Sequence, residues 1–444
     1  MKPLMNKSSD RQSFTSLGPL VGELGVPGDK SITHRALILA ALARGRSVLT
    51  GVGRGLDVAA TARILGSVGA VVAGDPAKSQ LEVEGCGWSG LTESTDVLDA
   101  GNSGTTLRLM LGVLAAARGA FFLSGDASLR GRPMGRIVAP LRAMGATIDG
   151  RAGGDRAPLM VRGSELTGVD HVLPVASAQV KSALLLAGLR AHGRTTVTEP
   201  AASRDHTERM LAAVGVPIER RGQWSSVAGR HEDLAPVARR IPGDISSAMF
   251  LVVAATLVPG SDVTVTGVGL NPTRTGALEV LEAMGARIEV GSPVDLGGEP
   301  AGCIRVRAGE LGAAAIDAAI VPRLVDELPI LAIAATQATG ETVISGAAEL
   351  RVKESDRIAT VVQGLKVVGA DVDALDDGLV IRGPCALRGG VVDSHGDHRV
   401  ALAFAVAGLI AKGKVEVEGW HAVDSSFPEF LGLLDRVGRG GSPR

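Results

Sequence analysis

Runs of almost purely apolar residues recur along the chain, and each closes on Gly before a segment of alternating polarity. Six apolar helices are predicted, closed by Gly45, Gly119, Gly193, Gly260, Gly340 and Gly413. Gly suits this place because the residue after a helix often turns left-handed, which only Gly does without steric cost. The alternating segments that follow, such as residues 195–198 and 414–417, predict half-buried strands.

A second, amphipathic helix is predicted in each repeat, followed by at least one further strand, for example residues 159–162 or 379–382. These helices end in a Val-Gly or Met-Gly pair at Gly69, Gly145, Gly215, Gly285, Gly369 and Gly438. The period, roughly 74 residues, exceeds the 20 to 50 residues typical of solenoid repeats. We therefore expect six α/β subdomains rather than a stacked array.

The strongest internal match divides the chain into halves. Residues 26–29 (Val-Pro-Gly-Asp) precede one apolar helix, and residues 241–244 (Ile-Pro-Gly-Asp) precede another. We predict a discontinuous domain of residues 1–28 and 243–444, and an inserted domain of residues 29–242, each with three repeats. The leading strand of the chain then belongs with the last three repeats. A single pseudo-symmetric domain is the alternative.

Composition narrows the class of protein. The longest apolar runs, residues 400–411 and 249–258, fall short of the roughly 18 residues that a bilayer crossing needs, so we expect a soluble protein without a membrane partner. The net charge of −1 argues against nucleic acid as a partner. Three scattered cysteines and the lack of a secretory signal indicate the cytoplasm. We expect a monomer.

Polar residues stand where the six apolar helices begin: residues 30–35, 102–106, 177–179, 244–247, 326–327 and 397–399. Helix capping explains many of the Ser, Thr, Asp and Asn residues among them. It does not explain Lys30, Arg35 or Arg399, because a cation at a helix N-terminus opposes the helix dipole. These cations indicate an anion that the side chain and the backbone N–H groups share.

Further cations lie at or just before the second helices, in residues 129–133 with Arg132 and in residues 353–357 with Lys353 and Arg357. A solvated charged face is the alternative interpretation of either run. Together with the helix starts, they predict a cleft between the halves that suits small, multiply charged anions. His395 and His398 could ligate a metal, but no second ligand cluster accompanies them, so we expect no metal. No nucleotide-binding loop or serine nucleophile motif is present.

In this order, the motifs resemble the 5-enolpyruvylshikimate-3-phosphate (EPSP) synthase family over nearly the whole chain. The resemblance rests on residues 27–35, 101–105, 130–134, 177–179, 351–357 and 396–399. It implies an α/β fold of two domains, each of three βαβαββ units around a pseudo-threefold axis (an inverse α/β barrel), with the active site in the interdomain cleft. It also implies transfer of the enolpyruvyl group of phosphoenolpyruvate to the 5-hydroxyl of shikimate 3-phosphate, by addition and then elimination of phosphate, with neither cofactor nor metal.

The resemblance assigns residues to both substrates. Those for phosphoenolpyruvate are Lys30, Asn102, Gly104, Arg132, Gln179, Arg357 and Arg399. Those for shikimate 3-phosphate are Lys30, Ser31, Arg35, Ser177, Ala178, Gln179, Arg204, Asp326 and Lys353. Asp326 is the candidate base on the 5-hydroxyl, and Glu354 or Lys30 would carry the proton to and from the methylene carbon.

Two departures from the family pattern matter. Many members carry Lys-Thr-Phe-Pro near the end, where residues 425–428 are Ser-Ser-Phe-Pro, so one expected cation is missing. Ala178 and Lys181 resemble a second group of the family that also has Ser-Phe-Pro. The family is the target of glyphosate, and Gly104 stands where Ala would crowd that inhibitor.

Two alternatives remain at this level. The sister enzyme that places enolpyruvyl on UDP-N-acetylglucosamine shares the fold, but it usually has Cys where this chain has Ala127. A non-catalytic ring that clamps DNA could also be built from six α/β units. Such a clamp needs a basic inner face, which the near-neutral charge does not favour.

Overall fold

The computed structural model describes residues 10–75, 79–230 and 232–439. The chain forms two compact units. The first combines the residues up to Pro27 with Gly243–Val294 and the residues from Ala301 onward, and the second combines Gly28–Pro242 with Asp295–Pro300. Of the predicted domains, residues 1–9 and 440–444 lie outside the described part. Within the described residues, no helix has the length and apolar character needed to cross a membrane.

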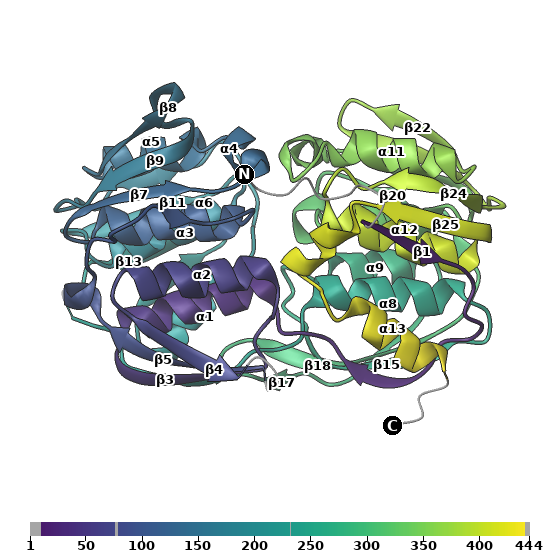
Figure 1. Cartoon of the computed structure of the whole chain (residues 1–444), viewed down its shortest axis with the longest axis horizontal. Helices are drawn as coiled ribbons and strands as arrows, with labels where there is room; N and C mark the ends of the chain where they lie inside the picture. The colour runs from purple at the N-terminus through teal and green to yellow at the C-terminus, as the bar shows by residue number, and fades with distance from the viewer. Residues whose placement is uncertain (1–9, 76–78, 231, 440–444) are drawn as a thin grey trace. The chain divides into compact units, whose positions relative to one another are not determined.

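Three apolar helices form the centre of each unit (Figure 1). In the second unit they are α1 (Lys30–Leu42), α3 (Gly104–Ala115) and α6 (Ala178–Gly188). In the first unit they are α8 (Ile245–Leu257), α10 (Leu328–Ala335) and α12 (His398–Ile410), which contact one another pairwise. Nearly every residue of α8, α10 and α12 is buried, which explains why the sequence shows no polar face there.

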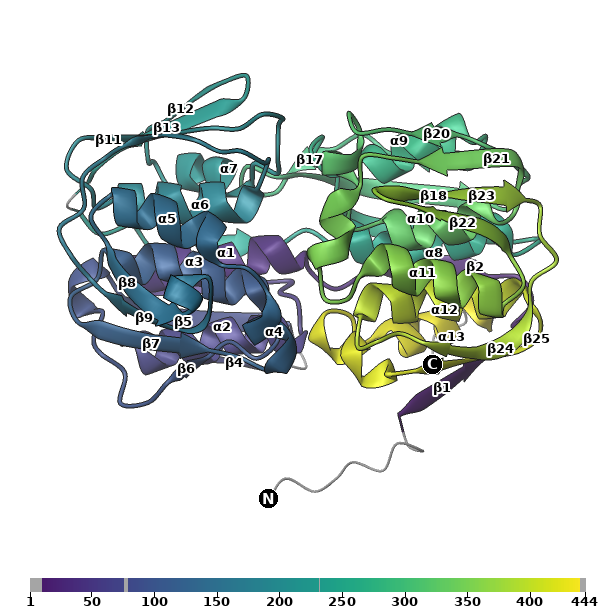
Figure 2. The same ribbon diagram turned by 90° about the horizontal axis from the view of Figure 1, so that it is seen from above.

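Three mixed sheets lie outside the central helices of the second unit (Figure 2). Their strand orders are β14 (Ala238–Arg240), β3 (Arg44–Thr50), β5 (Gln80–Cys86), β4 (Val71–Asp75); β6 (Leu98–Asp99), β7 (Ala120–Ser124), β9 (Arg156–Arg162), β8 (Thr147–Arg151); and β10 (Asp170–Val172), β11 (Arg194–Thr198), β13 (Trp224–Ala228), β12 (Ile218–Arg221). The first pair in each sheet is parallel and the rest are antiparallel. The amphipathic helices are α2 (Leu56–Ser67), α5 (Gly135–Ala143) and α7 (His206–Ala213), with the short α4 (Ala127–Gly131) before α5.

The first unit has the corresponding sheets and the amphipathic helices α9 (Gly276–Ala283), α11 (Arg357–Val367) and α13 (Phe430–Gly438). Its sheets are β16 (Arg287–Val290), β18 (Pro300–Arg307), β15 (Asp262–Gly269), β2 (Val21–Gly25), with β17 (Val294–Asp295) beside β18; β19 (Leu311–Gly312), β21 (Ala338–Ile344), β23 (Gly378–Gly383), β22 (Asp371–Leu375), with β20 (Ala315–Ile316) beside β21; and β1 (Arg11–Phe14), β25 (Lys412–Glu418), β24 (Arg388–Asp393). The predicted alternation of strand and helix is confirmed.

The sixth repeat departs from the other five. After β25 the chain passes through the 3₁₀ helix Trp420–Ser425 into α13, and no described strand follows. The antiparallel place beside β25 is taken by β1, with Phe14 opposite Val415. The start of the chain therefore completes the last sheet.

Leading strands are exchanged at the two Pro-Gly crossings. β2 precedes α1 yet pairs in parallel with β15, and β14 precedes α8 yet pairs in parallel with β3. The Asp29 N–H donates to the Pro242 carbonyl at 2.8 Å, and the Asp244 N–H donates to the Pro27 carbonyl at 2.8 Å. Gly28 is required there, because a Cβ would lie 1.8 Å from the Gly51 carbonyl oxygen.

The two sets of glycines have different roles. Gly69, Gly145, Gly215, Gly285 and Gly369 follow their helix caps at positive φ. The last four make the paired bonds of a Schellman motif, as where the Gly145 N–H donates to the Arg142 carbonyl and the Ala146 N–H to the Leu141 carbonyl. α13 ends in the predicted Val-Gly pair at Gly438, which is its last helical residue and has no positive φ. The apolar helices end a few residues before the glycines that were predicted to close them. For example, α1 ends at Leu42, and Gly45 lies within β3.

The segment Asp295–Pro300 packs with the second unit, although residues 243–444 were predicted as one block. Glu299 Oε1 lies 2.8 Å from His206 Nδ1, and both side chains are buried. Arg209 donates to the Gly298 carbonyl at 3.2 Å, and Arg239 donates to the Gly297 carbonyl at 2.6 Å. Short polar segments of this kind show no hydrophobic period that would reveal their packing partner.

Candidate active site

Residues of the predicted site in the second unit gather at the starts of its central helices. Asp29 caps α1 by accepting the Ile32 N–H at 2.8 Å, which places Lys30 in the first helical position. Lys30 Nζ lies 2.9 Å from Asp57 Oδ2, in the first turn of α2. A cation opposed by the helix dipole is thus balanced locally by a carboxylate. The predicted helix starts are confirmed.

The α3 start holds two of the proposed phosphoenolpyruvate residues. Ser103 caps the helix, and Asn102 Oδ1 accepts a hydrogen bond from Arg132 Nη2. The Asn102 amide donates to Asp126 Oδ2 at 2.7 Å, and Asp126 itself caps α4. Arg132 is buried just after α4. Arg132 and Asp126, which flank α4, therefore both contact the side-chain amide of Asn102 at the start of α3.

Gly104 leaves room for two guanidinium groups. A Cβ at Gly104 would lie 2.8 Å from Arg108 Nη1 and 3.3 Å from Arg132 Nη1. Arg108 Nη1 donates to Gln179 Oε1 at 2.8 Å, and the Gln179 amide donates to Thr105 Oγ1 at 2.9 Å. Asn102, Gly104, Arg132 and Gln179 are thus joined through contacts around the α3 start.

Arg35 is buried within a hydrogen-bond network of the second unit. Its guanidinium donates to Thr207 Oγ1 and to Ser182 Oγ at 2.7 Å each, and to the Ser31 carbonyl at 2.9 Å. Burial lowers the pKa of Arg35 to about 10, which Glu208 and Asp29 partly oppose, and the nearby charge of Arg204 lowers it further.

The α6 start carries the residues predicted to meet the substrate phosphate. Ser177 caps α6, with Ser177 Oγ accepting the Val180 N–H at 3.4 Å. Ala178 and Gln179 are the first two helical residues, and the Ala178 carbonyl accepts a bond from Ser182 Oγ. Arg204 lies two residues before α7, and its positive charge acts on Arg35.

In the first unit, the predicted residues surround Arg357, which is 1% exposed. Its Nε donates to Asp397 Oδ2 at 2.8 Å, its Nη2 to Glu354 Oε2 at 2.6 Å, and its Nη1 to Asp326 Oδ1 at 3.2 Å. Burial by itself lowers the pKa of Arg357, but the three carboxylates outweigh it and raise the pKa above its usual value. The guanidinium is therefore held charged in a buried, acid-rich environment.

Arg399 joins the same group. Its Nη1 donates to the Asp326 carbonyl at 3.2 Å, and its Nη2 lies 3.8 Å from Asp326 Oδ2. Asp326 thus lies between two guanidinium groups. Lys353 does not join them through a direct bond, because its Nζ pairs with Glu349 Oε1 at 2.7 Å.

Known proteins resemble this chain over almost its full length. The family model for EPSP synthase (3-phosphoshikimate 1-carboxyvinyltransferase) matches residues 14–434. A 3-phosphoshikimate 1-carboxyvinyltransferase of Desulforudis audaxviator is 54% identical over 418 residues, covering 94% of this chain and 97% of that protein. The chain belongs to the EPSP synthase family.

Solved structures agree with this assignment. The EPSP synthase of Acinetobacter baumannii superposes with a TM-score of 0.86 at 41% identity, covering 96% of this chain and 98% of that one. The enolpyruvyl transferase NikO of Streptomyces tendae is 20% identical with a TM-score of 0.79, and shares the fold. The family and the two-domain enolpyruvyl-transferase fold that the motifs predicted are confirmed, and the family favours the predicted activity over the sugar-nucleotide and clamp alternatives.

Sequence reasoning missed several partners of the site in this EPSP synthase family member. Asp57, Arg108 and Asp397 each contact a predicted substrate residue directly. The sequence placed Asp397 at a helix start, where capping explains an Asp. In the structure Asp397 caps α12, and it is also the most deeply buried of the carboxylates that bind Arg357. Arg108 lies one helical turn after Gly104, at the i+4 spacing that could have revealed it.

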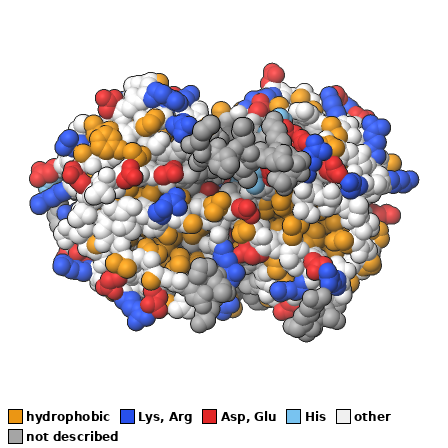
Figure 3. All heavy atoms as spheres, in the orientation of Figure 1, with side chains coloured by type: hydrophobic (Ala, Val, Ile, Leu, Met, Phe, Trp, Pro, Cys, Tyr) orange, Lys and Arg blue, Asp and Glu red, His pale blue; other side chains and the backbone are white. Residues whose placement is uncertain are grey.

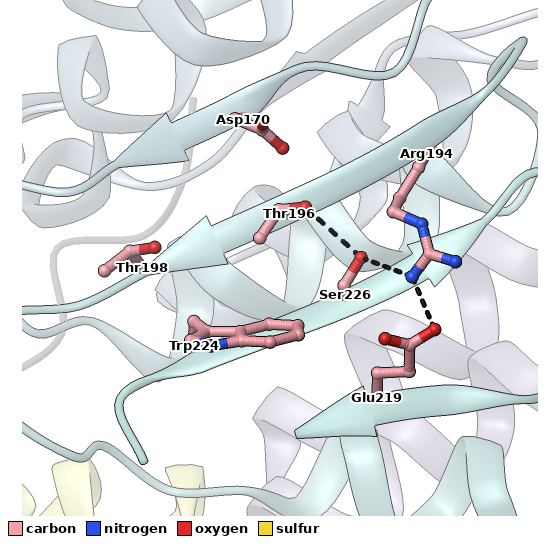
Figure 4. A pocket seen from close by; sticks show the side chains of 7 residues that line it. All are labelled: Asp170, Arg194, Thr196, Thr198, Glu219, Trp224 and Ser226. Carbon is pink, nitrogen blue, oxygen red and sulfur yellow. Dashed lines mark hydrogen bonds and ion pairs between the residues drawn. The ribbon is translucent and has the colours of Figure 1, made fainter. Parts of the chain in front are cut away.

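A hollow lies on the sheet of β10, β11, β13 and β12 (Figure 4). It measures about 540 Å³ and is lined by Asp170, Arg194, Thr196, Thr198, Glu219, Trp224 and Ser226. Its cation, Arg194, pairs with Glu219 at 2.7 Å. None of the predicted site residues line it.

Charges elsewhere are mixed. On the face drawn in Figure 3, Lys and Arg side chains are interspersed with Asp and Glu. Among the described residues, no group of three His, Cys, Asp or Glu side chains is arranged to hold a metal ion. His395 pairs with Asp393, its neighbour in the sequence.

Proposed function

We propose that the chain transfers the enolpyruvyl group of phosphoenolpyruvate to the 5-hydroxyl of shikimate 3-phosphate through two groups of side chains, one in each unit. Membership of the EPSP synthase family supports this type of reaction. The observation that supports the residue assignment is a pair of clusters that contain arginine, around Arg132 in one unit and around Arg357 and its carboxylate partners in the other. We propose that both clusters face the cleft in which the substrates bind.

Phosphoenolpyruvate carries a carboxylate and a phosphate, which need several cations. Lys30, Arg132 and Gln179 would serve from the second unit, with Asn102 orienting Arg132 and Gly104 keeping space for it. Arg357 and Arg399 would serve from the first unit. Guanidinium groups suit this task because they form paired, charge-assisted hydrogen bonds to carboxylate and phosphate oxygens.

Shikimate 3-phosphate would lie against the starts of α1 and α6. Ser177, Ala178, Gln179 and Arg204 would hold its phosphate, and Ser31 its carboxylate end. Arg35 would bind the carboxylate end together with Ser31, whose carbonyl accepts a hydrogen bond from Arg35 Nη1. Asp326 and Lys353 would meet the ring hydroxyls.

Asp326 is the proposed general base. In the structure it is engaged by Arg357 at 3.2 Å and lies 3.8 Å from Arg399. When phosphoenolpyruvate anions take over these guanidinium groups, Asp326 is left as a stronger base. It then accepts the proton of the 5-hydroxyl as the hydroxyl oxygen attacks C2 of phosphoenolpyruvate.

Addition also requires a proton on the methylene carbon, which becomes a methyl group in the tetrahedral intermediate. Glu354 or Lys30 would deliver it. Elimination then breaks the C2–O bond to phosphate, and the same group removes a methyl proton to restore the double bond. The cations around Arg132 and Arg357 stabilise the phosphate as it leaves. This chemistry calls for neither a cofactor nor a metal.

We also propose that the protein works as a cytoplasmic monomer on these small molecules. The three cysteines are free thiols, Cys86, Cys303 and Cys385, which suits a reducing compartment.

Phosphate release tests the activity. Purified protein with phosphoenolpyruvate and shikimate 3-phosphate should release phosphate, and omission of either substrate or replacement of the acceptor by UDP-N-acetylglucosamine should abolish the release. Asp326→Asn should lower kcat at least about 100-fold, in the range of general base catalysis. Turnover with the sugar nucleotide, or full activity of Asp326→Asn, would contradict the proposal.

A further inference from the structure

Three buried charged side chains lie beside the α6 start, and none of them is assigned to a substrate. Lys181 Nζ lies 2.8 Å from Glu199 Oε2 and 2.9 Å from Glu208 Oε1. The three side chains are 5%, 2% and 1% exposed. Burying charges costs several kcal/mol per ion before pairing repays it, so such a cluster is weak evidence for stability alone. It is better explained by what its carboxylates hold.

Glu199 ties together two segments. Its Oε1 accepts the Ser177 N–H at 2.8 Å, and its Oε2 accepts the Ser203 hydroxyl at 2.8 Å. Ser177 caps α6, and Ser203 directly precedes Arg204. One carboxylate therefore fixes both sides of the place proposed for the substrate phosphate.

The opposite side of the same helical turn is held by Arg35. Ser182 Oγ donates to the Ala178 carbonyl at 2.5 Å and accepts from Arg35 Nη2 at 2.7 Å. Thr207, which also accepts from Arg35, donates to Ser182 at 2.7 Å. With Glu199 on Ser177 and this network on Ala178, the first turn of α6 is fixed from two directions.

Lys181 makes a carboxylate tolerable at this place. A buried anion beside a phosphate site would repel a dianion strongly, because charges interact over several ångströms in a poorly solvated environment. Lys181 pairs with Glu199 at 2.8 Å and also with Glu208, so it offsets part of their negative charge and reduces the repulsion of an incoming phosphate.

We propose that Glu199, paired with Lys181, is a positioning residue that presets Ser177 and Arg204 for the phosphate of shikimate 3-phosphate. The inference rests on the proposed placing of that phosphate at the α6 start. Glu199 does not touch the substrate in this account. It acts through the two segments that it holds.

Glu208 provides a matched control. It shares Lys181 with Glu199 and is equally buried, but its Oε1 accepts from Ser225 in β13 at 3.1 Å. Glu199→Gln and Glu208→Gln thus remove one of two similar charges from the same lysine. Only the first also disturbs Ser177 and Ser203.

The test is steady-state kinetics of the purified full chain with both substrates, together with melting temperatures. Loss of a charge-assisted hydrogen bond predicts that Glu199→Gln raises KM for shikimate 3-phosphate about tenfold. KM for phosphoenolpyruvate and kcat should change less than about threefold, within the scatter of surface effects. Glu208→Gln should lower the melting temperature similarly but leave both KM values near those of the parent. Ser203→Ala, a milder change, should raise the same KM about threefold.

Equal KM changes in Glu199→Gln and Glu208→Gln, or a loss of kcat alone, would overturn the inference. Should Glu199→Gln not fold, the Ser203→Ala result decides: an unchanged KM for shikimate 3-phosphate overturns it. Arg204→Ala separates this failure from that of the proposed site. If Arg204→Ala raises this KM while Glu199→Gln does not, the positioning role alone is wrong, whereas an unchanged KM in Arg204→Ala rejects the phosphate site itself.

Discussion

At the residue scale, Asp397 both caps a helix and pairs with the buried Arg357. Asp397 caps α12 through the Arg399 N–H at 2.9 Å and binds Arg357 Nε at 2.8 Å, with no exposed surface. Asn is nearly as good a cap as Asp, so Asp397→Asn changes the charge and little else.

The first prediction concerns this substitution. Asp397→Asn should lower the free energy of unfolding by about 3 kcal/mol, the usual cost of removing one partner of a buried ion pair. Urea denaturation followed by circular dichroism measures it. Asp373→Asn, which removes an exposed partner of Arg382, should leave the midpoint unchanged. Equal midpoints in both variants would show that Asp397 contributes no more than a surface charge.

His34, in the first half of α1, is fully buried. Burial, and next the charges of Lys30 and Arg35, lower the pKa of His34 to about 3, against a raising effect of Asp29. Its Nδ1 lies 2.7 Å from Thr61 Oγ1, and within the described part of the chain its Nε2 has no hydrogen-bond partner. A proton added at Nε2 would bring a buried charge without an acceptor.

The second prediction follows from the sign of this shift. Between pH 6.5 and about 3 the unfolded chain binds a proton at His34 that the folded chain does not, so stability falls as the pH falls. Between pH 7 and 5.5 the parent should lose about 1 kcal/mol more than His34→Gln. Urea denaturation at both pH values measures the difference. Identical losses in the two proteins would place the titration elsewhere.

Some residues of the site could be predicted and others could not. Helix-start cations and caps such as Lys30, Asp244 and Arg399 are visible because they break the apolar pattern. The pairing of Asp57 with Lys30, or of Asp397 with Arg357, joins residues from different elements, and no local pattern encodes that distance. Arg35 stays a predicted substrate residue, and its hydrogen bonds to Thr207, Ser31 and Ser182 join three elements that no local pattern connects.

At the element scale, the glycine pattern predicted the repeats but blurred two kinds of helix end. The amphipathic helices α5, α7, α9 and α11 end in Schellman motifs, where positive φ is required. The apolar helices α1, α8 and α12 end instead on extended residues, Ala43, Val258 and Ala411. Their glycines lie in the following turn or strand, a shift of a few residues that hydrophobic periodicity cannot resolve.

Two glycines with open space around them, Gly215 and Gly66, allow the backbone effect of a Cβ to be tested. A Cβ would meet nothing within 4 Å at Gly215, which has φ +78°, or at Gly66 in α2, which has ordinary helical φ. Gly215→Ala should cost about 1 kcal/mol of stability through left-handed strain. Gly66→Ala should gain about 0.5–1 kcal/mol through helix propensity. Guanidinium denaturation distinguishes the signs, and a shared sign would contradict the distinction between the two positions.

At the scale of the whole molecule, the sequence revealed two sets of three repeats but not every exchange between them. The Pro-Gly-Asp pair at residues 27–29 and 242–244 marked both crossings, and β2 pairs with β15 as expected for the leading strand. The pairing of β1 with β25 and the packing of residues 295–300 against α7 depend on long-range contacts that no repeat pattern contains.

In the proposed site, cations from both units bind one phosphoenolpyruvate molecule. Arg132 and Arg399 test it, one from each unit, and Arg305, whose exposed pair with Asp262 lies outside both clusters, serves as the control. Each variant, changed to Gln, must first show a cooperative melting transition.

Calorimetric titration of phosphoenolpyruvate in the presence of shikimate 3-phosphate, with Asp326→Asn added to the parent and to every variant to suppress turnover, measures this shared binding most directly. Arg132→Gln and Arg399→Gln should each weaken binding at least about tenfold, the loss expected for one charge-assisted contact, while Arg305→Gln binds like the parent. If either Arg132→Gln or Arg399→Gln binds phosphoenolpyruvate as tightly as the parent, one unit does not contribute to its site and the account is wrong.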